Sequence, residues 1–302
     1  MGLQPRDFSN SGPGGMKPHG FAVVQEKGTL PTIRSRELGN GLRAAMRASG
    51  MGVRDLARRL GWAHPYVSHL LSGNRSYSEV DLLSVLFACD VKQEERQRLL
   101  RLAGESKTQG WLQQYDSVVP EQPRTLLDHE REMTSLAGMY LCILPKLLQT
   151  EEYARATLAH GAKDAETRVR TRLGRQVLFT RSPPPRTVFF LHESALRATV
   201  GDRATLSGQL HHLLRMSVRP SLELRVIPSA LGVHAGYAGS FTLMEFTKHE
   251  PVVYLESEVS AVFLEKPHQI AAYRRILSAL EPEALDRKKS QELITAIAVE
   301  LS

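Results

Sequence analysis

The chain has 302 residues, with 39 Lys and Arg against 32 Asp and Glu and a formal net charge of +7. Its 42% hydrophobic and 24% charged residues are typical of globular proteins, and its length allows two domains with separate cores. No apolar run approaches the ~20 residues that a membrane helix needs. Two cysteines, Cys89 and Cys142, are too few for a disulfide framework or a metal cluster. We therefore expect a reduced, cytoplasmic protein without a membrane partner.

Residues 1–31 form the first segment, which is rich in Gly, Pro, Ser and Asn. It contains no apolar block of the kind found in signal peptides. This composition predicts either a disordered leader or a start codon placed upstream of the true one.

Residues 52–75, GVRDLARRLGWAHPYVSHLLSGNR, predict two short helices joined by a sharp corner. Apolar residues recur at helical spacing on both sides of Gly61, which can take the positive φ that such a corner requires. Pro65 is tolerated because it falls in the first turn of the second helix, where its missing N–H has no partner. This is the pattern of a helix-turn-helix, whose second helix can enter the major groove of DNA.

Three more short helices are expected around this corner. Their apolar stripes predict them over residues 35–49, 78–88 and 93–103. In the helix expected over residues 78–88, the apolar stripe consists of Val80, Leu83 and Phe87. Together the five helices predict a lambda-repressor-like DNA-binding domain over residues 32–104.

The charge of this region agrees with contact to phosphates. Residues 32–104 hold 12 Lys and Arg and 7 Asp and Glu, so they carry +5 of the chain's +7. The candidates for contact with base edges are His64, Pro65, Ser68, His69 and Ser72. The candidates for contact with phosphates are Arg54, Asn74, Arg75, Arg43 and Arg58. Val53 and Ala63 depart from the common repressor pattern, which has a phosphate-binding Gln and a capping Ser or Thr at these positions.

After a polar linker at residues 105–110, the sequence predicts an α+β domain over residues 111–302. Its helices are expected near 124–136, 150–160, 166–180, 193–199, 203–217, 267–280 and 288–301, and its strands near 186–191, 221–227, 240–247 and 251–256. The strand at 221–227 alternates between apolar and charged residues, which predicts one covered and one solvated face. The second domain is therefore expected to be a mixed or antiparallel sheet covered by helices.

The segment PKLLQTEEYARATL at residues 145–158 resembles a conserved segment of the WhiJ-like regulators, which are actinobacterial helix-turn-helix proteins of the XRE type. Further similar segments follow in the same order, among them QLHHLL at 209–214, LRVIPSALGVHAGYAGSF at 224–241 and VVYLES at 252–257. Lys146 stands where these proteins usually have glycine. The resemblance implies transcription regulation and, for some members, an antitoxin-like relation to a small companion protein.

In the second domain, the loop containing His234, Gly236 and Tyr237 is the candidate site for a ligand or partner, because glycine-rich loops often form the rim of such sites. Four histidines of this domain suggest a metal, but none has the spacing of a known motif, so we expect neither metal nor cofactor. A self-cleaving repressor is also conceivable, because Ala-Gly bonds occur at 103–104 and 137–138. No Ser–Lys pair at short spacing accompanies them, and we expect no catalytic residues and no enzyme.

These features together predict a cytoplasmic, sequence-specific DNA-binding transcriptional regulator whose second domain senses a small-molecule effector or a companion protein. A homodimer is expected, because two modules on adjacent half-sites raise affinity for double-stranded DNA. The alternative is an antitoxin-like interaction protein that sequesters a small companion protein and uses DNA binding to regulate its own operon.

Overall fold

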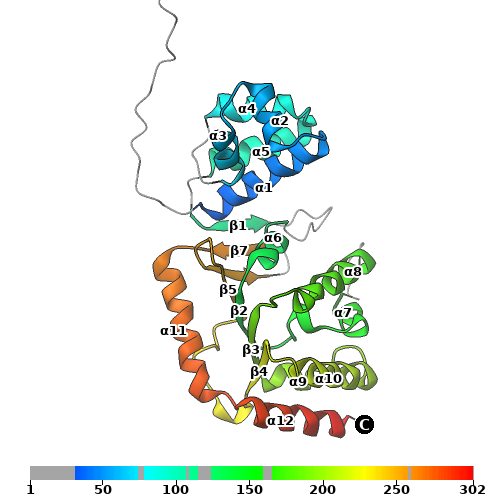
Figure 1. The fold of residues 1–302 in the computed structure, drawn as a ribbon. Coiled ribbons are helices and arrows are strands. Elements are labelled where there is room, and N and C mark those ends of the chain that lie inside the picture. The colour runs from blue at the N-terminus through cyan, green and yellow to red at the C-terminus, as the bar shows by residue number, and fades with distance from the viewer. Residues whose placement is uncertain are drawn as a thin grey trace, which may run out of the picture.

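The computed structural model describes residues 31–73, 78–106, 109–114, 124–158, 165–257 and 260–301. The leader predicted over residues 1–31 thus lies outside the described residues, apart from Pro31. A bundle of five helices is followed by a mixed sheet that carries helices on both faces (Figure 1). This is the predicted fold class.

The five helices of the N-terminal bundle lie within a few residues of their predicted bounds. They are α1 (Ile33–Ala48), α2 (Val53–Leu60), α3 (His64–Leu71), α4 (Glu79–Ala88) and α5 (Gln93–Gly104). The prediction for α4 had the correct span but the wrong face. Val80 and Phe87 are 72% and 60% exposed, and Leu82, Val85 and Leu86 form its buried face. Because α4 is apolar on several sides, its periodicity did not determine which side faces the core.

The sheet of the C-terminal domain has seven strands in the order β1-β7-β6-β5-β2-β3-β4. The strands are β1 (Trp111–Gln114), β2 (Ser135–Tyr140), β3 (Arg186–His192), β4 (Leu222–Ile227), β5 (Phe241–Glu245), β6 (Val252–Glu256) and β7 (Ser260–Leu264). β2, β3 and β4 are parallel, and all other neighbouring pairs are antiparallel. The sequence prediction contained four of these strands and missed β1, β2 and β7; it also ran the preceding helix into β2.

Helices cover both faces of this sheet. They are α6 (Arg124–Glu132), α7 (Glu151–Leu158), α8 (Ala165–Arg175), α9 (Glu193–Arg197), α10 (Arg203–Ser217), α11 (Pro267–Glu283) and α12 (Arg287–Glu300), with 3-10 turns η1 (Lys146–Leu148), η2 (Gln176–Thr180) and η3 (Ser229–Leu231). α11 lies alone on one face, and α6, α7, α8 and α10 lie on the other (Figure 1). None of the described helices combines the length and apolar character that crossing a bilayer requires.

The expected solvated face of β4 is partly covered, which corrects the prediction: the side chain of Arg225 is 13% exposed and that of Glu223 is 35% exposed. Leu222, Leu224 and Val226 point into the larger core, as the alternation indicated. On the other face, Arg225 donates hydrogen bonds to the carbonyls of Leu285 and Ala284, at 2.6 and 3.2 Å, at the end of α11. An alternating pattern shows that polar side chains occupy one face, but a helix terminus can cover them by accepting their hydrogen bonds.

The helical bundle is seated at the β1/β7 edge of the sheet (Figure 1). Glu265, which follows β7, accepts hydrogen bonds from the backbone N–H of Ile33 at 3.0 Å and of Gly110 at 2.8 Å. Ile33 itself belongs to the core of the second domain. The first turn of α1 is therefore held by the sheet, and burial raises the pKa of the Glu265 carboxyl above its ordinary value.

Candidate DNA interface and ligand cavity

The corner between α2 and α3 has the geometry that the sequence indicated. Gly61 ends α2 in the left-handed conformation with φ 68°, and Ala63 precedes α3 in an extended conformation without a side-chain cap. Leu56 and Ala57 of α2 are buried with Val67 of α3, so the apolar faces of the two helices meet beneath the corner. This packing leaves the opposite face of α3 turned outward.

Two glycines and Arg43 fix the end of α3 against α1. A Cβ on Gly39 would lie 2.5 Å from the carbonyl oxygen of Leu71, and one on Gly73 would lie 2.5 Å from that of Ser35. The Arg43 guanidinium donates to the same Leu71 carbonyl and to Asn40. A glycine inside a helix is costly, so Gly39 in α1 was the sequence signal for this close approach.

Arg43, a predicted phosphate contact, is half-buried, and its guanidinium donates to the C-terminal end of α3. A cation near the last carbonyls of a helix stabilises that helix end. The structure thus gives Arg43 the task of positioning α3.

The outward face of α3 brings together four of the five predicted base-contacting residues. His64, Pro65, Ser68 and His69 are exposed and follow the helical spacing of one surface. Ser72, the fifth, is half-buried, and its hydroxyl donates to the carbonyl of His69 at 2.8 Å. The first four side chains form what we call the α3 face.

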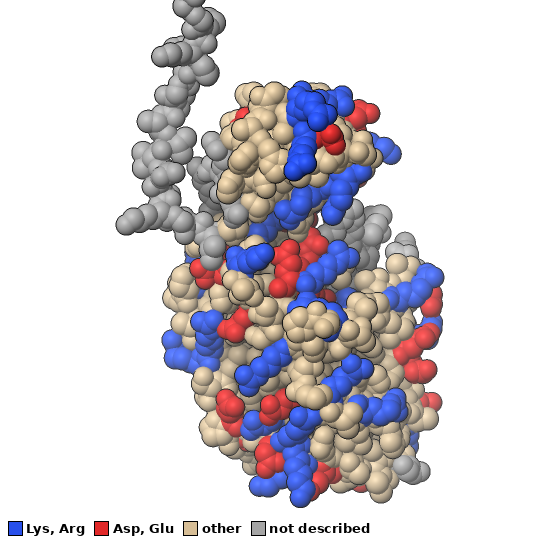
Figure 2. Space-filling model, viewed as in Figure 1, with Lys and Arg blue, Asp and Glu red and all other residues tan. Residues whose placement is uncertain are grey.

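On the side of the bundle shown in Figure 2, basic side chains gather over α1 and α2. Arg54, in the first turn of α2, is exposed. The side chain of Arg58 is 81% exposed and lies 3.6 Å from Asp55 in a loose ion pair. Asn74 and Arg75, the other predicted phosphate contacts, lie outside the described residues.

An aromatic pair supports the α3 face from within. Trp62 and Tyr66 pack edge to face with ring centroids 5.1 Å apart. The Tyr66 hydroxyl donates to Asp81 of α4 at 2.5 Å. The orientation of α3 is therefore fixed by contacts to α1, α2 and α4.

The loop predicted as a ligand or partner site uses its residues mainly for packing. His234 is buried and stacks on His192 with centroids 5.4 Å apart, and burial followed by the neighbouring His192 lowers its pKa. Its Nδ1 accepts from the N–H of Gly236, where a Cβ would lie 2.9 Å from Met139. Tyr237 alone of the three is freely exposed, at 65%. Within the described ranges no group of three or more His, Cys, Asp and Glu residues is arranged to hold a metal ion.

A cavity of about 360 Å³ lies between the sheet and the helices on the α6 side, and we call it the sheet cavity. Its floor is mostly apolar and comes from β2, β5 and β6 through Leu136, Tyr140, Met244 and Tyr254. Its roof comes from α6, η1 and α8 and includes Leu126, Glu130, Lys146, Leu147 and Arg175. Cys142 and Ser257 also line it.

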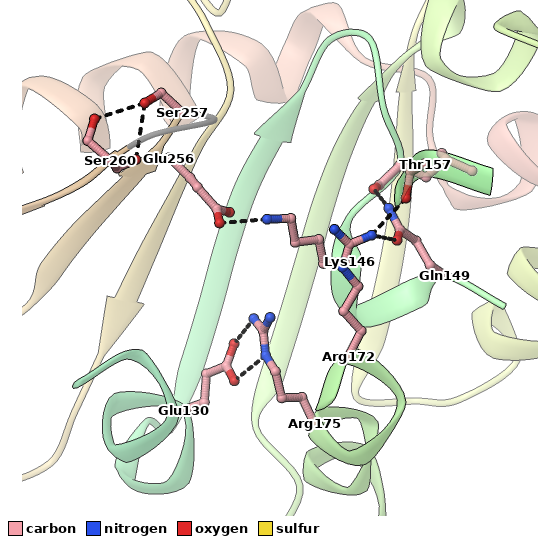
Figure 3. Close-up of polar contacts among 10 residues, drawn as sticks. Glu130, Lys146, Gln149, Thr157, Arg172, Arg175, Glu256, Ser257 and Ser260 are labelled. Carbon is pink, nitrogen blue, oxygen red and sulfur yellow. Dashed lines mark hydrogen bonds and ion pairs between the residues drawn. The ribbon is translucent and has the colours of Figure 1, made fainter. Parts of the chain in front are cut away.

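Charged side chains converge over this floor (Figure 3). Lys146 Nζ lies 2.5 Å from an oxygen of Glu256, and Arg175 Nε and Nη2 donate to the two Glu130 oxygens at 2.9 and 2.5 Å. Burial lowers the pKa of Lys146, and burial raises that of Tyr140 to about 12. The Tyr140 hydroxyl is thus a neutral hydrogen-bonding group, with Thr242 as its partner at 2.9 Å.

The sequence analysis did not assign the sheet cavity. Its charged residues come from four elements that are far apart along the chain, so they form no motif. The nearest signal was Lys146, which the sequence analysis noted as a departure from the segment it resembles.

Two family models match the chain in agreement with this architecture. Residues 37–99 match a helix-turn-helix domain, which supports a DNA-binding regulator. Residues 123–296 match the domain of unknown function DUF5753, which covers more than half of the chain. The chain belongs to the DUF5753 family. No curated protein was found to match it. The DUF5753 domain contains both the sheet cavity and the loop of His234.

Proposed function

We propose that this protein is a sequence-specific transcriptional regulator that inserts α3 into the major groove of double-stranded DNA. The observation that carries this proposal is the α3 face, on which His64, Pro65, Ser68 and His69 are exposed together. Histidine and serine side chains can bond base edges, and the proline can contact a thymine methyl group. Arg54 and Arg58 lie on the preceding helix and would contact phosphates, together with Asn74 and Arg75.

The proposal includes two copies of the chain on adjacent half-sites. One module of this size buries a modest DNA interface, so a second copy raises both affinity and specificity. Exposed Val80 and Phe87 on α4 offer apolar surface for such a homodimer. The similarity to WhiJ-like actinobacterial regulators supports a cytoplasmic protein of this class.

We further propose that the DUF5753 domain receives the signal. Its sheet cavity favours a small-molecule effector over a companion protein, because cavities lined by apolar walls and a few charged groups suit small ligands. In the companion-protein alternative, the DUF5753 domain would instead sequester a small protein, and the cavity would have no ligand.

Fluorescence anisotropy with the DNA upstream of the protein's own gene, compared with a random fragment, tests the DNA proposal. His69→Ala and Ser68→Ala are expected to change the preference between sequences, by about 1–3 kcal/mol at the contacted base pair. Arg54→Ala and Arg75→Ala are expected to weaken binding to every sequence equally and to lower the slope of log affinity against log salt concentration by about 1.

The matched controls are His268→Ala and Lys288→Ala, which remove exposed side chains of α11 and α12 in the DUF5753 domain. They should leave DNA binding unchanged. Equal affinity of the native protein for its upstream DNA and for random DNA would refute the regulator proposal. Unchanged binding by both Arg75→Ala and His69→Ala would refute the placement of α3.

A further inference from the structure

The sheet cavity divides into an apolar and a charged part. Leu136, Met244 and Tyr254 of the sheet and Leu126 of α6 give it apolar walls. Lys146, Glu256, Glu130 and Arg175 project into the same space above β2 (Figure 3). Such a division suits a ligand with one charged end and an apolar body.

Lys146 and Arg175 are the cations that line this part of the cavity, and Glu130 and Glu256 are the carboxylates beside them. Glu130 accepts hydrogen bonds from Nε and Nη2 of Arg175. The third nitrogen of this guanidinium, Nη1, is directed toward Lys146 and the cavity (Figure 3). A ligand carboxylate at this point would accept hydrogen bonds from both Nη1 of Arg175 and Nζ of Lys146.

The pKa of Lys146 supports the same conclusion. Burial lowers it, and both Arg172 and Arg175 lower it further, while Glu256 alone acts in the opposite direction. A ligand anion beside Lys146 would stabilise the charged amine that its surroundings now disfavour.

We propose that the sheet cavity binds a small amphipathic monocarboxylic acid, with its carboxylate beside Lys146 and Arg175 and its apolar body over β2, β5 and β6. This inference rests on the proposed function, in which the DUF5753 domain senses an effector. An arginine nitrogen and a lysine amine together supply the charge-assisted hydrogen bonds that a carboxylate accepts.

Helix α6 links ligand binding in the cavity to the DNA-binding domain, because it contacts both. Leu126 and Glu130, one turn apart, line the cavity. On another side of the same helix, Asp128 accepts from Asn40 of α1 at 2.5 Å, and Thr125 donates to Glu37 of α1 at 3.2 Å. Since α1 also holds the end of α3, a shift of α6 changes the position of the α3 face relative to the sheet.

Three probes of matched shape test the ligand class on the native chain: 4-phenylbutyrate, 4-phenylbutanol and 4-phenylbutylamine. Calorimetry should detect binding of the butyrate, with the alcohol and the amine about tenfold or more weaker. The butyrate should also slow alkylation of Cys142, which is exposed and lines the cavity, without affecting the buried Cys89 in the helical bundle. No binding of the butyrate up to about 10 mM, or equal binding of the alcohol or the amine, would overturn the proposal.

Lys146→Gln removes one proposed contact at a half-exposed position and should weaken the butyrate about tenfold while leaving the alcohol unchanged. The control is Lys288→Gln, whose side chain is 86% exposed on α12, and it should bind the butyrate as the native chain does. An affinity within about twofold of native for Lys146→Gln would overturn the placement of the carboxylate.

The link through α6 is tested by DNA binding with and without saturating 4-phenylbutyrate. We expect the DNA dissociation constant to change about fivefold or more, and DNA to change the butyrate constant by the same factor. Asp128→Ala should abolish this mutual effect and leave butyrate binding to the free protein intact, whereas the exposed α12 control Glu292→Ala should keep both.

A native chain that binds the butyrate with unchanged DNA affinity would overturn the link. Butyrate binding without any specific DNA binding would refute the proposed function and leave the cavity assignment standing.

Discussion

Removing the guanidinium of Arg175 is expected to destabilise the DUF5753 domain much more than removing an exposed arginine of the same fold. Arg175 and Glu130 form a two-point ion pair, and their side chains are only 8% and 6% exposed. Arg175→Met keeps much of the side-chain volume but leaves the Glu130 carboxylate buried beside an apolar group. Breaking a buried pair in this way costs about 3–5 kcal/mol of unfolding free energy.

The chain contains a matched control in Arg274 and Glu245, which lie 2.7 Å apart with side chains 52% and 42% exposed. Arg274→Met should cost at most about 1 kcal/mol, because water screens such a pair and solvates the remaining carboxylate. The double variant Arg175→Met with Glu130→Leu removes both buried charges and should recover most of the loss, since apolar replacements of a buried pair are often neutral.

Urea unfolding measures these differences, with Trp111 as the fluorescent reporter in a Trp62→Phe background. Trp111 belongs to β1 and packs against Phe263 of β7 with ring centroids 6.5 Å apart, so its emission reports on the sheet. The slope against urea should be the same in all variants, so that shifts of the midpoint reflect stability. If Arg175→Met lost no more stability than Arg274→Met, the argument from burial would be refuted.

Three further predictions concern His129, two glycines and Tyr66. His129 is buried against Phe246 and Phe263, and burial followed by Arg36 lowers its pKa from 6.5 to about 3, so only the unfolded chain binds its proton as pH falls below 6.5. The native chain should therefore lose stability between pH 6.5 and about 3 with a slope about 1.4 kcal/mol per pH unit steeper than His129→Gln, and equal slopes in urea titrations would contradict this. Gly61→Ala should cost about 1–2 kcal/mol of unfolding free energy from its φ of 68° alone. Gly73→Ala should cost more and also weaken DNA binding, because its Cβ would meet the Ser35 carbonyl. Equal losses of stability for the two variants in thermal unfolding would count against that clash. Tyr66→Phe should cost about 1 kcal/mol by losing the hydrogen bond to Asp81, with a correspondingly lower melting temperature, and an unchanged melting temperature would show that water replaces it.

The helical bundle was predictable because its signals are local. Gly61, Pro65 and the apolar residues around them act within one or two helical turns, and the structure follows them closely. The face of α4 was not predictable in the same way. With Val80, Leu83 and Phe87 on one side and Leu82 and Leu86 on another, only the packing of the neighbouring helices determines which side is buried.

Strand β2 shows why the centre of the sheet was missed. Its sequence, SLAGMY, contains none of the β-branched residues that mark a strand. The segment is extended because β3 and β5 pair with it on both sides, and both lie dozens of residues away along the chain. Gly138 is needed there because a Cβ would lie 2.7 Å from the Tyr140 ring and 3.0 Å from the Phe241 carbonyl. Long-range pairing of this kind leaves little trace in a single sequence.

The candidate sites differ in the same way, between residues grouped by local sequence and residues brought together by long-range packing. The α3 face lies on one short helix, so helical spacing alone grouped its residues. The sheet cavity is assembled from Glu130, Lys146, Arg175 and Glu256, which approach one another only when α6, η1, α8 and β6 pack. The loop of His234 attracted attention through its glycines, yet at Gly236 the missing side chain makes room for Met139.

The junction between the domains gives α1 a position that a flexible tether could not provide. Its first turn is bound by Glu265 and contributes Ile33 to the core of the DUF5753 domain. Its middle contacts α6 through Glu37 and Asn40, and the adjoining Gly39 and Arg43 hold the end of α3. One continuous helix therefore touches the sheet, the roof of the cavity and the helix proposed to enter DNA. Because a helix bends little over this length, a displacement of α6 or of the end of β7 would move α1 as a unit and reorient the α3 face, without any change in the packing between α2 and α3.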